Sequence, residues 1–200
     1  MKSLTQIILI FLLTSLMTNI NATVWKVNSN AGTDPDFAEV QQAIDAAEPG
    51  DIIQIESGIY QGFTINKPLE IIGTCYDMSV HNDIPTPIQP VYINGDVIFD
   101  LGSEGSSMSS VNLGQSSSNV LLRVSDIQIT RSDFYYLYFQ TLKHAGYSGG
   151  SETLNSKTTI NNVLITNSKI YNITQKKSTF AADTLLVTNC MFSNCIIDEG

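Results

Sequence analysis

Basic residues are scarce in this chain. Ten lysines and arginines stand against nineteen aspartates and glutamates, which gives a formal net charge of −9. A chain of this sign repels the phosphate backbone, so we expect no nucleic-acid partner. The same charge opposes direct binding of a polyuronate unless a cation such as Ca²⁺ bridges the carboxylates, whereas neutral glycans meet no such barrier.

Metal ligands are also few. His81 and His144 have no cysteine, histidine or carboxylate at ligand spacing, so we expect no transition-metal site. Asp34 and Asp36 offer two oxygens to Ca²⁺, but a dependable calcium site needs roughly six or more ligands, and no spaced acidic loop supplies the others. We expect no cofactor, with Ca²⁺ as the one cation that an incomplete set of carboxylates leaves open.

The apolar run at the N-terminus is too short for an ordinary membrane span. Lys2 gives a basic start, Ile7 to Met17 form the apolar core, and a polar end reaches Ala22. This pattern predicts a secretory signal peptide, residues 1–22, with an uncleaved anchor as the alternative. The remaining residues 23–200 are expected to form one domain that is secreted or held at the cell surface, with no membrane span after signal cleavage.

A capped helix opens the most informative stretch, Asp36 to Gly73. We expect Asp36 to be the N-cap of a helix ending at Ala47, with Glu39 completing a capping box and apolar residues along one face. Pro49-Gly50 ends it. Short β-branched and aromatic runs follow, separated by turn residues. A helix with one apolar face before short stacked strands is typical of a β-solenoid, whose open end the helix covers.

The segment DFAEVQQAIDAAEPGDIIQIESGIYQGFTINKPLEIIG resembles the N-terminal part of pectin-lyase-like right-handed β-helix proteins. It is most similar to the segment that opens pectin methylesterases and related secreted repeat proteins. The resemblance covers Val24 to Gly73 and implies an all-β, right-handed parallel β-helix with a short N-terminal capping helix. It implies little about activity, because this segment carries none of the catalytic groups of the family.

An internal repeat predicts that one coil of the solenoid contains roughly 22 residues, a length that repeat proteins commonly use. Val163–Ile173 aligns without gaps with Leu185–Cys195, and an earlier copy at Leu122–Ile129 lies nearly two such coils before. Apolar positions are expected to stack inside the solenoid, and asparagines to form a ladder where the coil turns, because asparagine tolerates left-handed backbone. The expected pairs are Asn167 over Asn189, Asn172 over Asn194, Ile165 over Val187 and Ile170 over Phe192.

The sequence offers few candidates for the catalytic residues of the β-helix lyases and pectin methylesterases that it resembles. Those lyases use a basic residue with acidic Ca²⁺ ligands, and the methylesterases use two aspartates beside an arginine. Arg131 and Asp133 form either such a pair in a groove or, as we favour, a surface ion pair. Asp96 and Asp100 form either an acidic pair or, as we favour, the flanks of an ordinary strand.

Five aromatic residues fall within Phe134–Phe139, and Tyr147 lies near them in sequence. Aromatic faces stack on the apolar faces of sugar rings, so exposed tyrosines would form a glycan platform. In the alternative, the segment is a buried strand with Phe134, Tyr136 and Tyr138 on one face. We expect at least one face to be buried, and the candidate glycan-binding residues are Tyr135, Tyr136, Tyr138 and Tyr147.

Three segments rich in proline, serine or glycine are expected to protrude as loops: Asp83–Pro90, Gly102–Asn119 and Tyr147–Lys157. Asn94-Gly95 is either a hairpin turn or a tight corner between two coil strands.

Three cysteines form an odd set for a secreted chain. Cys195 aligns with the apolar Ile173, so we expect a buried thiol there, and Cys190 aligns with Ser168. A Cys190–Cys195 disulfide is the alternative, and Cys75 is the third member of the set.

Three functional hypotheses follow. In the first, a secreted or cell-surface β-helix repeat protein engages extracellular polysaccharide without catalysis. In the second, the chain is the N-terminal part of a polysaccharide lyase or carbohydrate esterase whose active site lies downstream. In the third, it is a structural spacer. Because the sequence stops at Gly200 directly after a regular coil, we expect it to continue in a longer chain.

Overall fold

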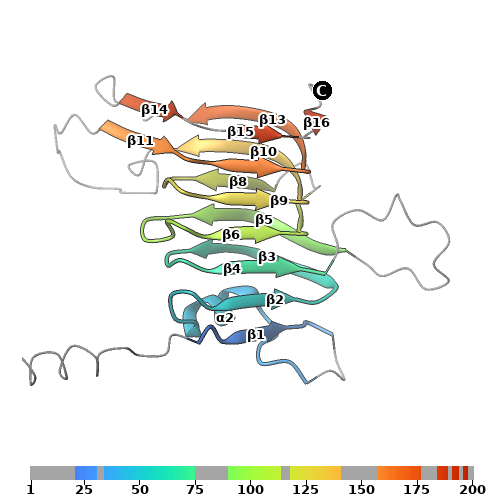
Figure 1. The fold of residues 1–200 in the computed structure, drawn as a ribbon. Helices are drawn as coiled ribbons and strands as arrows, with labels where there is room; N and C mark the ends of the chain where they lie inside the picture. Colours follow the sequence, from blue (N-terminus) through green and yellow to red (C-terminus); the bar gives the residue numbers. More distant parts are fainter. Residues whose placement is uncertain are drawn as a thin grey trace, which may run out of the picture.

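The computed structural model describes residues 21–30, 34–74, 90–113, 118–140, 157–176, 184–188, 191–193 and 196–197. Most of these residues lie in strands, and every strand pairing is parallel. Figure 1 shows the strands stacked from β1 and α2 at one end to β13, β14, β15 and β16 at the other. The predicted all-β class is confirmed.

The first sheet contains seven strands in the order of the sequence. They are β1 (Val24–Val27), β2 (Ile52–Ile55), β4 (Glu70–Gly73), β6 (Ser107–Ser109), β9 (Gln128–Thr130), β12 (Leu164–Thr166) and β15 (Met191–Ser193).

The second sheet takes the strands that alternate with these along the chain. They are β3 (Gly58–Ile65), β5 (Val91–Phe99), β7 (Asn112–Leu113), β8 (Asn119–Leu122), β10 (Asp133–Gln140), β13 (Lys169–Lys176) and β16 (Ile196–Ile197). Both β7 and β8 lie between β5 and β10. A two-stranded sheet joins β11 (Lys157–Asn161) to β14 (Thr184–Thr188).

The core consists of aligned apolar side chains from successive strands. In the first sheet, five residues that pair in register from β2 to β12 are all buried: Ile53, Ile71, Met108, Ile129 and Ile165. A second row, Phe63, Val97, Val120 and Leu137, is buried in the second sheet. Because full burial of such a side chain is favourable by roughly 1.5–3 kcal/mol, these rows fix which face of each strand points inward.

Helix α2 (Val40–Ala46) lies at the β1 end of the stack (Figure 1). Val40, Ala43 and Ile44 are buried and belong to the core, which confirms the expected apolar face. The helix is shorter than predicted at both ends. Its C-terminal carbonyls receive an ammonium group, since Lys67 Nζ donates to the Ala47 carbonyl at 2.8 Å.

The predicted N-cap at Asp36 is wrong. Glu39 occupies the N-cap position and makes no side-chain cap bond. Asp36 instead forms hydrogen bonds with the backbone of Lys26 in the edge strand β1. Its Oδ2 accepts from the Lys26 amide at 2.8 Å, and its own amide donates to the Lys26 carbonyl at 3.0 Å. Phe37 forms a parallel bridge with Val27. Residues 36–37 thus satisfy backbone groups of an edge strand instead of starting the helix.

Three of the turns from the first to the second sheet, those after β6, β9 and β12, contain a left-handed residue. Ser110, Arg131 and Asn167 follow β6, β9 and β12 and have φ of 59°, 46° and 51°. They are stacked, because the Ser110 amide donates to the Thr130 carbonyl and the Arg131 amide to the Thr166 carbonyl. The expected left-handed turn at Asn167 is confirmed.

The register predicted from the internal repeat is wrong where the structure describes both partners. Ile165 pairs with Phe192, not with Val187, and Ile170 pairs with Ile197, not with Phe192. The earlier copy was also misplaced, since Ile165 pairs with Ile129. Asn189 and Asn194 lie outside the described residues, and so do Cys75, Cys190 and Cys195.

The prediction of a loop over Gly102–Asn119 is wrong in part. This segment contains β6 and β7, and it buries Met108, Val111 and Leu113. Its serines fill tight turns: Ser106 Oγ accepts from the Leu69 amide at 3.1 Å. Of the other expected loops, residues 83–89 and 147–156 lie outside the described residues.

Both alternatives for Asn94-Gly95, the hairpin turn and the tight corner between two strands, are wrong. β5 runs through this dipeptide as one strand, with an irregularity in its register to β3 between Gln61 and Phe63. Gly95 has φ 128°, which a residue with a Cβ rarely adopts. In the part of the chain that the structure describes, no helix is long and apolar enough to cross a membrane.

Candidate functional site

Three tyrosines of β10 lie on the outer side of the second sheet. Phe134, Leu137 and Phe139 are buried, whereas Tyr135, Tyr136 and Tyr138 are half-buried. The expected strict alternation, with Tyr136 on the face of Phe134, is therefore wrong. We call Tyr135, Tyr136 and Tyr138 the tyrosine cluster.

The break in alternation occurs where the neighbour of β10 changes. Phe134 pairs with Leu113 of β7, but Tyr136 pairs with Asn119 of β8. In β10, Tyr135 alone separates the partners of Leu113 and Asn119. Two consecutive tyrosines stay out of the core where this change of neighbour occurs.

The rings of the cluster touch one another. The ring centroids of Tyr135 and Tyr136 are 4.9 Å apart with an edge-to-face tilt of 67°. Those of Tyr136 and Tyr138 are 5.4 Å apart with nearly parallel planes, 19° between them. Such contacts hold each ring in place, so that little side-chain freedom is lost when a ligand binds.

Polar groups border the cluster on the β8 side. Asp96 Oδ1 accepts from the Asn119 amide at 3.1 Å and from Asn119 Nδ2 at 2.6 Å. Burial raises the pKa of Tyr138, and the nearby Tyr136 and Asp96 raise it further. The phenol therefore stays protonated at neutral pH and can both donate and accept hydrogen bonds.

Flat aromatic faces rimmed by neutral hydroxyls and amides suit a sugar ring, whose C–H face stacks and whose hydroxyls bond at the edge. The structure brings together three of the four predicted glycan-binding residues. The fourth, Tyr147, lies outside the described residues.

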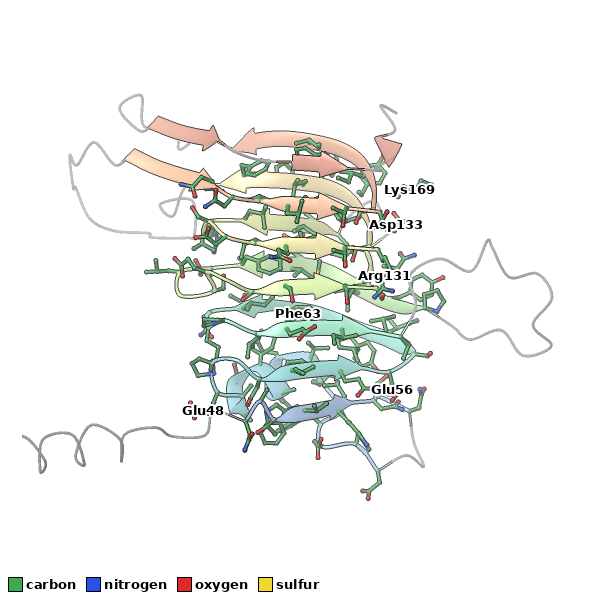
Figure 2. All side chains as sticks on the ribbon, in the orientation of Figure 1. Glu48, Glu56, Phe63, Arg131, Asp133 and Lys169 are labelled. Atoms are coloured by element: carbon green, nitrogen blue, oxygen red, sulfur yellow. The ribbon has the colours of Figure 1, made fainter. Side chains whose placement is uncertain are left out.

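Charged residues lie at the turn that leads into β10. Arg131 is exposed, Ser132 is buried, and Asp133 pairs in register with Lys169 of β13. Figure 2 shows Arg131, Asp133 and Lys169 on the same side of the stack. Lys169 was not among the predicted site residues. Its place beside Asp133 is nevertheless indicated by the sequence, because Lys169 follows Ile165-Thr166-Asn167-Ser168 as Asp133 follows the similar Ile129-Thr130-Arg131-Ser132.

The remaining acidic and basic candidates have structural partners. Arg123, 8% exposed, forms an ion pair with Asp100, Nη1 to Oδ2 at 3.2 Å. Asp96 lies within β5 and Asp100 directly after it, and their carboxylates bond to different residues, Asn119 and Arg123. The two carboxylates are thus not an acidic pair, but the expectation that both flank a strand is right for Asp100 alone, because Asp96 lies inside β5.

No group of three or more histidine, cysteine, aspartate or glutamate residues is placed to hold a metal ion within the described ranges. His81 and His144 lie outside those ranges. Of the predicted asparagine ladder, Asn167 lies in its left-handed turn, and Asn172 of β13 pairs in register with Tyr136.

Comparisons of this chain with models of known protein families, with curated proteins and with solved structures found no match.

Proposed function

We propose that the parallel sheets are coils of a right-handed parallel β-helix, and that this secreted or cell-surface protein binds a neutral extracellular polysaccharide without cleaving it. The tyrosine cluster is the binding site in this proposal.

The path of the chain supports the β-helix. The chain passes from one parallel sheet to the other and back, and each return adds the next strand to the growing edge. Stacked left-handed residues at Ser110, Arg131 and Asn167 are the tight turns that such coils need. Parallel strands joined by crossovers are right-handed in nearly all proteins, which is the reason for the proposed hand.

One observation carries the binding proposal, namely the gathering of three tyrosine rings on the outside of β10. Buried phenylalanine and leucine side chains anchor the same strand, so the cluster stands on a rigid element. Such contacts with sugar are individually weak, and a row of rings along a strand suits a chain of repeating sugars better than a single small ligand.

Charge favours a neutral ligand. The chain carries an excess of nine negative charges, and Asp96 contributes to the surroundings of Tyr138. A polyuronate would meet repulsion at this site unless a cation intervened. Hydroxyl-rich neutral glycans would meet phenols and amides instead.

The test is affinity electrophoresis of purified residues 23–200 in gels with a soluble neutral β-glucan, xylan or mannan, and with polygalacturonate or alginate with and without Ca²⁺. We expect retardation by at least one neutral glycan. Removing one stacking ring should cost about 1 kcal/mol, so Tyr136→Ala should weaken binding roughly fivefold. Tyr92→Ala, at a half-buried tyrosine of β5 outside the cluster, is the matched control.

Unchanged binding in a Tyr135→Ala/Tyr136→Ala variant would refute the tyrosine cluster as the site. The non-catalytic part is tested separately by incubation with pectin and polygalacturonate. Unsaturated products or methanol that disappear in Arg131→Ala would instead support a lyase or esterase, and complete absence of glycan binding would support the structural spacer.

A further inference from the structure

A glycan acceptor tripeptide lies beside the tyrosine cluster. Asn172-Ile173-Thr174 has the Asn-X-Thr sequence, with X other than proline, that is the substrate for N-glycosylation in secreted proteins. A second such tripeptide, Asn21-Ala22-Thr23, is divided by the expected cleavage after Ala22. Asn172 is therefore the one acceptor in residues 23–200.

The position of this tripeptide in β13 suits a bulky modification. Ile173 packs against the core from β13. Paired residues of neighbouring parallel strands share a face, and the partners of positions 172 and 174 in β10 belong to the half-buried tyrosine cluster. These two register positions therefore belong to the outer face of the second sheet. A large hydrophilic substituent is tolerated on that face and not on the other.

The parallel register places the tripeptide against the tyrosines. Asn172 pairs with Tyr136, and Thr174 pairs with Tyr138. Neighbouring strands are about 4.8 Å apart, so a sugar attached at position 172 begins within one ring diameter of β10. Figure 1 shows β13 directly next to β10 in the stack.

We infer that Asn172 is an N-glycosylation site and that the first sugar of its glycan packs on Tyr136. In the reaction, the amide nitrogen of Asn172 bonds to the anomeric carbon of a lipid-linked oligosaccharide. The bond from that carbon to the lipid diphosphate breaks, the diphosphate leaves as an anion, and the amide loses one proton. Attachment requires entry into the secretory pathway and does not require polysaccharide binding. Because the attached sugar and an external glycan would both need the ring of Tyr136, the binding test of the proposed function uses unglycosylated protein, and the two tests can fail separately.

The attachment is tested by translating the full 200-residue chain in the presence of glycosylation-competent microsomes. Protease protection identifies the translocated chains. We expect one step in electrophoretic mobility that an amide-cleaving glycosidase reverses, leaving aspartate at position 172 with the corresponding gain of about 1 Da. The step should vanish in Asn172→Gln and in Thr174→Ala and persist in Thr174→Ser and in Asn21→Gln.

A protected chain without the step, a step that survives Asn172→Gln, or failure of the chain to enter the microsomes would each overturn the site.

The contact with Tyr136 is tested on the secreted glycoprotein. Under native conditions the glycosidase should release the glycan several-fold faster from Tyr136→Ala than from wild type, because the first sugar loses its packing surface. Tyr92→Ala should leave the rate unchanged. After denaturation all three proteins should release the glycan at one rate, and equal native rates for Tyr136→Ala and wild type would overturn the contact.

Discussion

Asp51 ties three separate backbone and side-chain groups together at the β1 end of the molecule. Its Oδ1 accepts from the Thr23 amide at 2.8 Å, and its Oδ2 accepts from Trp25 Nε1 and from the Glu48 amide, both at 2.9 Å. Thr23 and Trp25 belong to the start of the first sheet and Glu48 to the end of the helix segment. Asp51 as a whole residue is only 5% exposed.

Asp51→Ala should therefore loosen this end strongly. A hydrogen bond to a charged group contributes roughly 1.5–3 kcal/mol, and the three bonds are not additive because they share one carboxylate and two donors belong to exposed residues. We expect a loss of about 2–4 kcal/mol in the free energy of unfolding. Asp45→Ala, which removes an exposed carboxylate bonded to Gln41, should change it by less than about 0.5 kcal/mol.

The assay is urea unfolding followed by the fluorescence of Trp25, the one tryptophan in the chain. The effect should depend on pH with a defined sign. Burial alone would raise the pKa of Asp51, but the bonds from Glu48, Thr23 and Trp25 outweigh it and lower the pKa below 3.8. The stabilisation is then fully present above pH 3.8 and is lost as the pH falls through the folded-state pKa.

The difference between wild type and Asp51→Ala should consequently be the same at pH 7 and pH 5 and smaller at pH 2.5. A difference that stays constant or grows towards pH 2.5 would refute the assignment to the ionised carboxylate. A variant within about 0.5 kcal/mol of wild type at pH 7, an amount typical of neutral surface changes, would refute the importance of the three bonds.

Two further predictions concern the second sheet. An added methyl group at Gly62 would collide with the backbone of Asp96, whose nitrogen lies 2.7 Å from the Cβ position, so Gly62→Ala should cost about 2–3 kcal/mol in urea unfolding, in the upper part of the range for overpacking. Gly50→Ala, which meets open space but has φ 94°, should cost about 1 kcal/mol by backbone strain alone, and equal costs for both would contradict the collision. Because burial raises the pKa of Tyr138 above 10.0, its stabilisation is present below pH 10 and declines as the pH rises further, so wild type should lose more stability between pH 9 and pH 11 than Tyr138→Phe does.

Local sequence patterns predicted the β-rich class and the first strands. Alternating Ile53, Ile55 and Ile71 point into the core, as their period of two requires. Gly50, next to Pro49, takes a positive φ of 94° at the turn after the helix. These features depend on a few neighbouring residues, so one sequence contains enough information to find them.

The register was not predictable from the strongest internal similarity, because the same motif occurs at different corners. Asn162 lies before β12 and Asn167 after it, and both have left-handed backbone, with φ of 54° and 51°. The sequence pattern of a strand, an asparagine and a second strand therefore fits the corner at Asn162 and the corner at Asn167 equally well. The alignment matched one corner to the next and so placed Val187 over Ile165, whereas the residue that pairs with Ile165 lies further along the chain, at Phe192.

The tyrosine cluster was located in sequence, but its outward gathering was not predictable from β10 alone. The break in alternation occurs where the partner of β10 changes from β7 to β8, and neither strand is adjacent to β10 in sequence.

The buried serines were missed for a related reason. Composition indicates a loop over Gly102–Asn119, yet Ser106 Oγ accepts from the Leu69 amide at 3.1 Å and donates to the Lys67 carbonyl at 3.3 Å, so this hydroxyl replaces missing backbone partners in a tight turn.

The number of residues between paired strands varies along this chain, so new segments can be inserted there during evolution or in engineering. Ile53 pairs with Ile71 and Ile71 pairs with Met108, and both pairings continue one uninterrupted row although the second connection is much longer than the first. Doubling the length of a flexible connection costs only about 0.6 kcal/mol in closure entropy. The register of β4 with β2 and β6 therefore does not depend on an equal number of residues between successive strands, and inserted residues should cost less between strands than within the buried rows.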